Sequence, residues 1–371
     1  MIENQSHLFD IPDGITYLDC ASNSPLLKSG KIAADKGLER KYHPWTLNRD
    51  DMVEEGETVR GLFADLIGAK AVDIAITPST AYGITTAANN LPLSRGQNIV
   101  VLQDQFPSNV YAWVELAKTN GGEILTVGRP INNNWTTAVL ETLNTNTAIV
   151  TVPHCHWTDG SFLDLVAIGK RCRELGAAFV IDSTQATGAY PMDVKALQPD
   201  FIACSAYKWL LSPYTLGFLY AAPHRQLGTP IELHNLNHAE GPEMYTDELS
   251  DGAGRYHMSE RFNYTNIPMA IDAMTQIKKW GVSEIHETLS HLIDYTANKA
   301  TNAGWVVPAK EHRIGHFTGM TRPEPIPPHA IHTLRSEKIY LSPRGTGLRV
   351  SPHLFNTTAD IDRLFHVLEN L

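Results

Sequence analysis

The sequence predicts an α/β fold with a large, doubly wound and mostly parallel sheet and a smaller C-terminal α+β domain. Between residues 60 and 220, short β-rich runs alternate with helical stretches, as in a sheet built from βαβ units. Residues 177–181 (AAFVI) are almost wholly apolar, which is typical of a strand covered on both faces. After residue 256 helical runs precede short strands, which indicates a second domain.

Each element of the large domain follows from a local pattern. Strands are expected at residues 73–77, 98–102, 123–127, 147–152, 177–181, 201–204 and 217–221. Helices are expected over residues 80–89 and 107–118. A third helix begins after Asp164, a good N-cap residue, and stops at Gly176, a residue suited to helix C-termini.

The smaller domain is predicted from shorter signals. Strands are expected near residues 315–320 and 339–341. The closing helix is amphipathic and carries on one face Ile361, Leu364, Phe365, Leu368 and Leu371. We therefore divide the chain into an N-terminal segment (1–14), a large domain (15–255) and a small domain (256–371). Residues 230–260 are polar and contain Gly and Pro, so they form a long loop, and the sequence leaves open whether that loop is a lid.

Composition narrows the classes of partner and the compartment. The chain has a net charge of -10 and no block of Lys and Arg, so we expect no nucleic-acid partner. No apolar run is long enough to span a membrane, and no signal peptide is recognisable. The four cysteines form no CxxC pair, which favours free thiols and a cytoplasmic location.

The strongest chemical signal lies between residues 180 and 217. Asp182 ends an apolar strand, where ligands of open α/β sheets bind, and its carboxylate needs a cationic partner such as a pyridinium nitrogen. Lys208 follows the next strand among apolar and aromatic residues, which lower the pKa of an amine and make it a better nucleophile. Alone, Asp182 could be a helix cap and Lys208 a surface lysine. Together, on neighbouring strand ends, they predict a site where one planar ring contacts both.

These residues resemble those of the class V aminotransferase family of fold-type I pyridoxal-phosphate (PLP) enzymes. That family includes cysteine desulfurases, kynureninase, cystine C–S lyases, hercynylcysteine sulfoxide lyase and isopenicillin N epimerase-like proteins. The resemblance extends from YLDCASNSP at residues 17–25 to LRVSPHLFNT at residues 348–357. The Asp-x-x-Gln…Lys segment, residues 182–208, is its most specific part.

The resemblance implies a role for each residue of that segment. Lys208 carries the cofactor as a Schiff base and, once released, acts as the general base at the substrate Cα. Asp182 pairs with the pyridine nitrogen, and Gln185 binds the phenolic oxygen. Ser205 and Tyr207 resemble phosphate ligands, although desulfurases have His where this chain has Tyr207.

A second segment, TPSTAYG at residues 77–83, resembles the phosphate loop of the family. Ser79 and Thr80 open a helix there, so free backbone N–H groups and the positive end of the helix dipole face the anion. Ordinary N-capping is the alternative explanation for both residues. In DQFPSNVYAW, residues 104–113, Phe106 is the candidate for stacking on the cofactor ring, with a core position as its alternative.

The segment HCHWTDG, residues 154–160, resembles the family stretch near the phenolic oxygen and the substrate Cα. His156 is a candidate cofactor ligand, and Trp157 and Thr158 are candidate pocket residues. His154 and His156 could suggest a metal site, but two imidazoles without further ligands are weak evidence, and we expect no metal.

Substrate binding and assembly are implied by three further segments. Arg349 resembles the residue that grips the substrate α-carboxylate, which suits a bidentate guanidinium, and Arg344 lies close by in the sequence. Asn23 of the N-terminal motif is a further candidate for substrate binding. RFNYTNIP, residues 261–268, resembles the segment that reaches the partner's phosphate, with Thr265 and Asn266 as candidates. That segment implies a homodimer with shared active sites.

The cofactor does not settle the reaction, because the protein chooses which bond at Cα breaks. Desulfurases take sulfur on a Cys of the C-terminal domain, and no Cys follows Cys204, so a mechanism of that type is not expected. The leading interpretation is β-elimination from a cysteine-derived amino acid. The alternatives are an aminotransferase, or an epimerase whose second acid/base is a Tyr or His of residues 230–260. A catalytically inactive binding protein is a further alternative, disfavoured by the intact motif. The substrate side chain and any accessory protein stay open.

Overall fold

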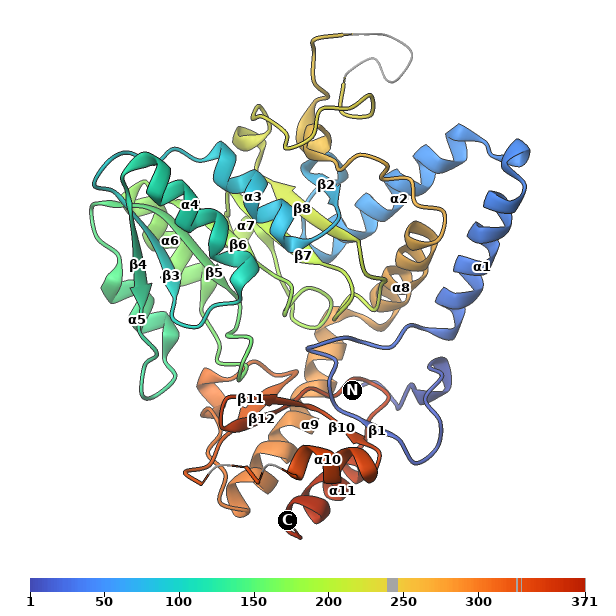
Figure 1. The fold of residues 1–371 in the computed structure, drawn as a ribbon, viewed down its shortest axis with the longest axis vertical. Coiled ribbons are helices and arrows are strands. Elements are labelled where there is room, and N and C mark those ends of the chain that lie inside the picture. Colours follow the sequence, from blue (N-terminus) through green and yellow to red (C-terminus); the bar gives the residue numbers. More distant parts are fainter. Residues whose placement is uncertain (239–245, 325, 328, 371) are drawn as a thin grey trace.

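A large upper lobe and a smaller lower lobe make up the chain (Figure 1). The computed structural model describes residues 1–238, 246–324, 326–327 and 329–370. The large lobe contains a seven-stranded sheet, and the small lobe contains a three-stranded sheet and a two-stranded sheet. The first and last described residues both lie in or beside the small lobe (Figure 1).

The large sheet has the strand order β2-β8-β7-β6-β5-β3-β4. Its strands are β2 (Ile74–Thr77), β3 (Asn98–Leu102), β4 (Glu123–Val127), β5 (Thr147–Pro153), β6 (Ala178–Asp182), β7 (Phe201–Ser205) and β8 (Gly217–Ala221). All neighbouring pairs are parallel except those of β8, which runs antiparallel to both β2 and β7. Every expected strand of this domain is present, and the predicted fold class is confirmed.

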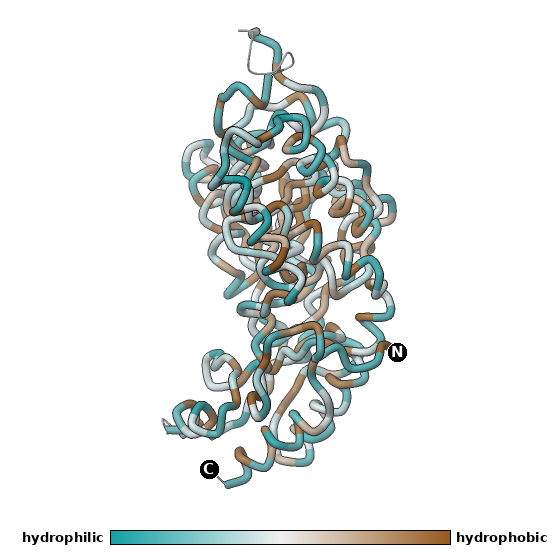
Figure 2. Tube along the Cα trace, turned by 90° about the vertical axis from the view of Figure 1, so that its right-hand side faces the viewer, coloured by the Kyte–Doolittle hydropathy of each residue, from teal (hydrophilic) through white to brown (hydrophobic). Residues whose placement is uncertain are grey.

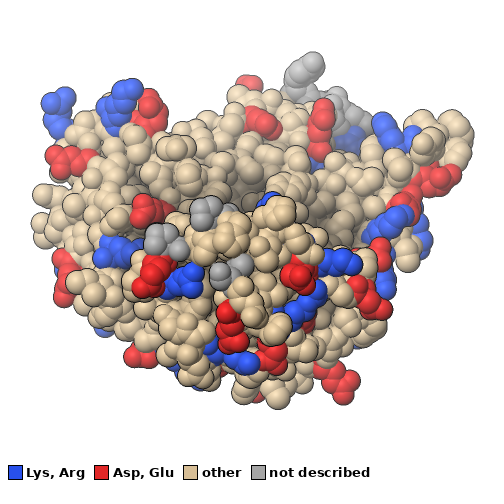
Figure 3. All heavy atoms as spheres, turned by 60° about the horizontal axis from the view of Figure 1, so that its bottom comes forward, with Lys and Arg blue, Asp and Glu red and all other residues tan. Residues whose placement is uncertain are grey.

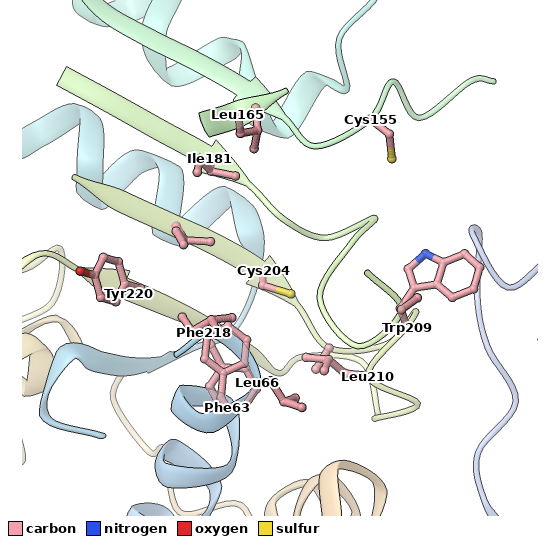
Figure 4. Close-up of a cluster of buried hydrophobic side chains, with 14 of the residues drawn as sticks. Phe63, Leu66, Cys155, Leu165, Ile181, Cys204, Trp209, Leu210, Phe218 and Tyr220 are labelled. Carbon is pink, nitrogen blue, oxygen red and sulfur yellow. The ribbon is translucent and has the colours of Figure 1, made fainter. Parts of the chain in front are cut away.

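Helices cover both faces of the sheet, because successive strand residues point to opposite sides. One face packs against helices α3 (Thr80–Asn90) and α4 (Tyr111–Asn120). The other face packs against α2 (Arg49–Ile67), α5 (Trp135–Thr142), α6 (Leu165–Leu175) and α8 (Asn266–Trp280). In β6, Ile181 points to this second face, where Phe63 and Leu165 also lie (Figure 4), and Val180 points to the first. The sheet is therefore doubly wound.

Local signals place the ends of the helices as expected. The Asp164 carboxylate accepts hydrogen bonds from the N–H groups of Val166 and Ala167, 3.0 Å each, at the start of α6. Gly176 ends that helix in a left-handed conformation, with φ of 68°, which glycine adopts without steric cost. The predicted helix over residues 107–118 is divided into a 3-10 turn (Pro107–Asn109) and α4.

The small lobe is built around helices that follow α8 in the chain. Its helices are α9 (Val282–Asn302), α10 (Ala330–Ser336) and α11 (Thr358–Leu368). Strands β11 (Ser342–Arg344), β12 (Gly347–Val350) and β9 (Thr318–Met320) form an antiparallel sheet in that order. Strand β1 (Thr16–Tyr17) pairs in parallel with β10 (Ile339–Tyr340). The expected apolar face of the closing helix is buried in the core of this lobe, except that Leu371 lies outside the described residues.

The contacts of α8 and of residues 16–17 bear on the predicted domain boundaries, which stay predictions. Helix α8 packs against α2 and α1 (Lys28–Tyr42), beside the large sheet (Figure 1). Residues 16–17 belong to a sheet of the small lobe instead. We therefore propose that the small lobe begins after α8 rather than at residue 256. In the tube view, apolar segments run through the middle of each lobe (Figure 2).

The surface and the thiols complete the description of the fold. Acidic and basic side chains are interspersed on the face shown in Figure 3, which is hollowed between the two lobes. Over the described part of the chain, no helix combines the length and apolarity that a membrane crossing requires. Cys20, Cys155, Cys172 and Cys204 are all buried free thiols.

Candidate active site

A cavity lies at the carboxyl ends of strands β5, β6 and β7, with an empty volume of about 810 Å³. Predicted site residues that line it are Ser79, Thr80, Phe106, Trp157, Asp182, Gln185, Ser205, Tyr207 and Lys208. They come from segments far apart in the sequence, and parallel strands bring them together because their carboxyl ends meet at one edge of the sheet. Figure 4 shows Cys155 and Trp209 beyond the ends of the strands that carry Ile181 and Cys204.

Asp182 and Lys208 form the charged centre of this cavity. Asp182 is the last residue of β6, and its Oδ1 accepts a hydrogen bond from the Thr184 N–H at 3.0 Å. Burial raises the pKa of the Asp182 carboxyl. Hydrogen bonds from the side chain and backbone of Thr184 and the positive charge of Lys208 act in the opposite direction and offset part of this rise. Lys208 is only 6% exposed, and burial, helped by the charge of Arg349, lowers the pKa of its amine to about 8. The amine therefore loses its proton, and becomes nucleophilic, more readily than the amine of an exposed lysine.

Hydroxyl groups and one helix N-terminus gather at one end of the cavity. Ser205 Oγ accepts a hydrogen bond from the Thr80 N–H at 3.0 Å and lies 2.8 Å from Thr80 Oγ1. Thr184 Oγ1 lies 2.7 Å from Thr80 Oγ1 and accepts from the Ser205 N–H at 3.2 Å. Ser79 caps α3 by accepting from the Tyr82 N–H at 3.2 Å. Such an arrangement of donors at a helix N-terminus suits a phosphate group.

Aromatic rings form the walls. Phe106 is 38% exposed and lines the cavity, and its ring lies 5.5 Å from Lys208 Nζ. Trp157 meets Phe106 edge-on, with ring centroids 5.4 Å apart, and donates its indole N–H to the Asp104 carbonyl at 2.7 Å. Tyr207 stacks on Tyr214, which also lines the cavity, with centroids 4.1 Å apart. A planar ring held between Phe106 and the strand ends would be enclosed by apolar surface.

Arg349 lies immediately behind Trp157. It is buried and donates hydrogen bonds to the Trp157 carbonyl at 2.7 Å and to Ser22 Oγ at 2.5 Å. Arg344 donates to the same Ser22 Oγ at 3.1 Å, so the two guanidinium groups share one acceptor. Asp19 is 3.5 Å from Arg349. Burial, with the charge of Arg344, lowers the pKa of Arg349 to about 10, and both guanidiniums remain cationic and suited to an anion.

Several predicted residues do not line this cavity. The His156 ring stacks on Trp135, 5.2 Å away, and its two nitrogens lie 2.7 Å from Thr158 Oγ1 and 3.0 Å from the Gln103 carbonyl, so we no longer propose it as a cofactor ligand. Predicted residues that the cavity lining does not include are His156, Thr158, Asn23, Thr265, Asn266 and Arg349, although Arg349 donates to the carbonyl of the lining residue Trp157.

Asn23, Asn266 and Thr265 have contacts of their own. The Asn23 carbonyl accepts a hydrogen bond from the Tyr17 hydroxyl at 2.5 Å. Asn266 reaches the site only indirectly, by donating its side-chain N–H to the Tyr214 carbonyl at 3.0 Å. Thr265 precedes α8 and hydrogen-bonds Asn263 Oδ1 at 2.9 Å. The predicted contact of Thr265 and Asn266 with a partner's phosphate stays a prediction.

Sequence reasoning missed Cys155, Thr184 and Tyr214, all of which line the cavity. A signal for Cys155 was present, because it lies two residues before Trp157, just after β5. Side chains two residues apart in an extended chain point to the same side. Burial raises the pKa of the Cys155 thiol well above its usual value. Thr184 sits between two predicted residues, Asp182 and Gln185, and gave no separate signal.

Two further expectations concern metals and the long loop. Within the described ranges, no group of three or more His, Cys, Asp or Glu side chains is arranged to hold a metal ion. Part of the loop at residues 230–260, including residues 239–245, lies outside the described residues. None of its described residues lines the cavity.

The cavity therefore combines a buried lysine, a buried carboxylate and an anion-binding helix end. Residues 46–364 match the family model of "Aminotransferase class-V". The chain belongs to this family. It is a PLP-dependent enzyme, as the resemblance implied, and the residues around the cavity fit that cofactor because they offer an amine, a carboxylate and phosphate donors along one cleft.

Curated relatives match between 85% and 97% of the chain at 22–26% identity. The uncharacterized aminotransferase YcbU of Bacillus subtilis is 24% identical over 97% of this chain and 95% of its own. A probable cysteine desulfurase of Pyrococcus abyssi is 26% identical, covering 85% of this chain and 82% of its own. Isopenicillin N epimerase of Amycolatopsis lactamdurans is 22% identical, covering 85% and 84%.

Solved structures confirm the fold. An apo cysteine desulfurase from Thermococcus onnurineus superposes with a TM-score of 0.86 at 20% identity, covering 100% of this chain and 98% of its own. The cystine C–S lyase C-DES, in complex with cysteine persulfide, gives 0.88 at 17% identity, covering 97% and 98%. At these identities the likeness concerns the fold alone.

Proposed function

We propose that this enzyme eliminates a sulfur group from Cβ of a cysteine-derived amino acid. The observation that carries this proposal is a lysine of lowered pKa beside a buried carboxylate, in a chain with no cysteine after Cys204 to receive sulfur. The resemblance in fold to a cystine C–S lyase supports it. The Cβ–S bond would break, and the sulfur would leave with the electron pair of that bond. The remaining three-carbon fragment, which still carries the amino group, would react with water to give pyruvate and ammonium.

The residues divide the work according to their chemistry. Lys208 would hold the cofactor as a Schiff base and then take the proton from the substrate Cα through its Nζ. Asp182 would keep the pyridine nitrogen protonated, because its buried carboxylate needs a cationic partner. The bound cofactor supplies an electron sink for the charge that develops at Cα.

Other side chains would bind and orient. Ser205 and Thr80 would hold the phosphate, and Phe106 would cover the ring. Arg349 would bind the α-carboxylate through the guanidinium that shares the Ser22 hydroxyl with Arg344.

We propose a homodimer in the cytoplasm as the working assembly. Exposed aromatic residues support the dimer: Trp45 is 78% exposed, and Tyr42 lies close to it at the end of α1. Aromatic residues are enriched in protein–protein interfaces. Asn266, which hydrogen-bonds the cavity residue Tyr214, would then lie where a second subunit could reach the site. Four buried free thiols support a reducing compartment.

An aminotransferase reaction is the second candidate, favoured by the relative named as an aminotransferase that covers 97% of this chain. It would use the same lysine, carboxylate and arginine. The difference lies in turnover, because a transaminase stops after one keto acid per site until a second keto acid accepts the amino group. An epimerase, the third candidate, would invert Cα and release no keto acid.

The test is a visible absorbance spectrum of the PLP-loaded enzyme, followed by product assays with cystine, cysteine sulfoxides and ordinary amino acids. Pyruvate and ammonium formed over many turnovers without an added keto acid would support the lyase. One equivalent of keto acid per site would refute it in favour of the aminotransferase, and a racemised amino acid would favour the epimerase. Lys208→Ala should lack the lysine-linked absorbance band, and a band that survives dialysis would refute the assignment of Lys208.

A further inference from the structure

The Gln185 side chain, which lines the cavity, is held by two hydrogen bonds. Its Oε1 accepts from the Trp209 indole N–H at 2.9 Å, and its Nε2 donates to the Ala21 carbonyl at 2.9 Å. The amide has one acceptor oxygen and two N–H donors. One N–H of Gln185 is therefore left over, on a side chain at the cavity wall.

The chemistry of these partners decides which way the amide points. An indole N–H can only donate, so the group that faces Trp209 must be the oxygen. A backbone carbonyl can only accept, so the group that faces Ala21 must be the NH₂. Both partners exclude the flipped amide, which would set donor against donor at Trp209 and acceptor against acceptor at Ala21. Only one orientation of the amide therefore satisfies both partners.

The Gln185 backbone is held as well. His316 Nε2 lies 2.6 Å from the Gln185 carbonyl, which can only accept, so His316 carries its proton on Nε2. Burial lowers the pKa of His316 to about 3, so the ring is neutral. Its ring also packs edge-on against Trp209, with centroids 4.4 Å apart. Trp209 and His316 thus pack against each other, and they bind the side-chain amide and the backbone carbonyl of Gln185, respectively.

Trp209 is placed by the same loop that carries the lysine. It follows Lys208 directly, is 1% exposed and lies beyond the end of β7 (Figure 4). The orientation of the Gln185 amide is therefore coupled to the position of Lys208 through one peptide unit.

We propose that Trp209 is a positioning residue that fixes the Gln185 amide so that an N–H donor faces the ring oxygen of the bound cofactor. This inference rests on the proposed function, since it assigns the spare donor to the PLP phenolic oxygen. A donor there stabilises negative charge on that oxygen and so favours the form of the lysine–cofactor linkage that has lost its proton. Trp209 therefore lowers the pKa of that linkage without touching it.

The experiment is a pH titration of the visible band of the PLP-loaded enzyme. Trp209→Phe keeps an aromatic ring but removes the five-membered part of the indole together with its N–H. We expect its titration midpoint to rise by roughly half a unit to one unit, the equivalent of one hydrogen bond. Other charged or ionisable groups that act on Lys208, namely Asp182, Arg349, Arg344 and Cys204, are unchanged in this variant.

Trp280→Phe is the matched control. Trp280 lies on α8, is 9% exposed and donates its indole N–H to Gln5 Oε1 at 3.1 Å, so it loses the same type of bond away from the cavity. Its midpoint should equal that of the wild-type enzyme. An unchanged midpoint in Trp209→Phe, or an equal rise in both variants, overturns the inference.

A second variant decides the matter if Trp209→Phe does not fold. Gln185→Glu keeps an acceptor for Trp209 but replaces the NH₂ group by oxygen, so the midpoint should rise at least as far. No rise in Gln185→Glu overturns the inference. Absence of any lysine-linked band in the wild-type enzyme would refute the proposed function instead, so the two failures are distinguishable.

Discussion

Replacing Lys208 by Met should stabilise the cofactor-free enzyme at neutral pH, although it abolishes the activity. The folded protein lowers the pKa of this amine from 10.5 to about 8, mainly by burial. Below pH 8 the amine is protonated in both the folded and the unfolded chain. Since a shift of one unit is equivalent to about 1.4 kcal/mol, burying the charged amine destabilises the folded state by about 3 kcal/mol at pH 7.

The penalty depends on pH in a defined direction. Because the folded-state pKa is the lower one, the folded chain loses its proton first, and the penalty falls as the pH rises from about 8 to 10.5. At pH 10 it should be about 1 kcal/mol. The advantage of Lys208→Met over the wild-type protein should therefore be large at pH 7 and small at pH 10.

The assay is thermal unfolding of the cofactor-free proteins at both pH values. For a chain of this length, 3 kcal/mol corresponds to a rise in Tm of about 4 °C. Lys118→Met is the control, because Lys118 is an exposed residue of α4 and its loss removes no buried charge. A cofactor-free Lys208→Met no more stable than wild type at pH 7, or with the same advantage at pH 10, would refute the claim that this amine is buried at a cost.

Two predictions concern ligand binding. Arg349→Gln should lower kcat/KM for α-amino acids by at least about 30-fold, because losing one partner of a buried charged contact costs about 2 kcal/mol or more. The variant should keep the visible cofactor band. An unchanged kcat/KM in steady-state kinetics would mean that another residue binds the substrate carboxylate. Ser205→Ala should weaken PLP binding by roughly 10- to 100-fold while leaving phosphate-free pyridoxal almost unaffected, since only the phosphate contact is lost. Equilibrium dialysis of both compounds checks this, and equal losses for the two would contradict it.

The sequence predicted the centre of the site because strand order and strand ends carry the information. Asp182 ends β6 and Lys208 follows the neighbouring strand β7, so their meeting needs only a parallel sheet. The α6 cap at Asp164 was equally local, and it is confirmed. For residues that lie at a strand end or cap a helix, the local sequence pattern was sufficient to predict their position.

Residues farther from strand ends were harder to place. His156 and Trp157 are neighbours after β5, and side chains alternate there, so only one of them could face the cavity. The family resemblance suggested the histidine as a ligand, and in the structure its ring stacks on Trp135. Asn23 was chosen from a motif, whereas Ser22 is the residue that meets Arg349. Such choices depend on long-range packing that a single sequence does not display.

The route of the chain has a consequence for synthesis on the ribosome. Residues 16–20 emerge early but bond to residues 339–351, through β1 with β10 and through the Cys20 N–H to the Ser351 carbonyl. The adjoining Ala21 carbonyl is the one that accepts from Gln185. An early segment that helps to hold the cavity residue Gln185 must therefore wait for residues 339–351 before it is fixed in place. A nascent chain cannot make these contacts before residues 339–351 have been synthesised, and a truncated product that lacks β12 would retain the large sheet without them.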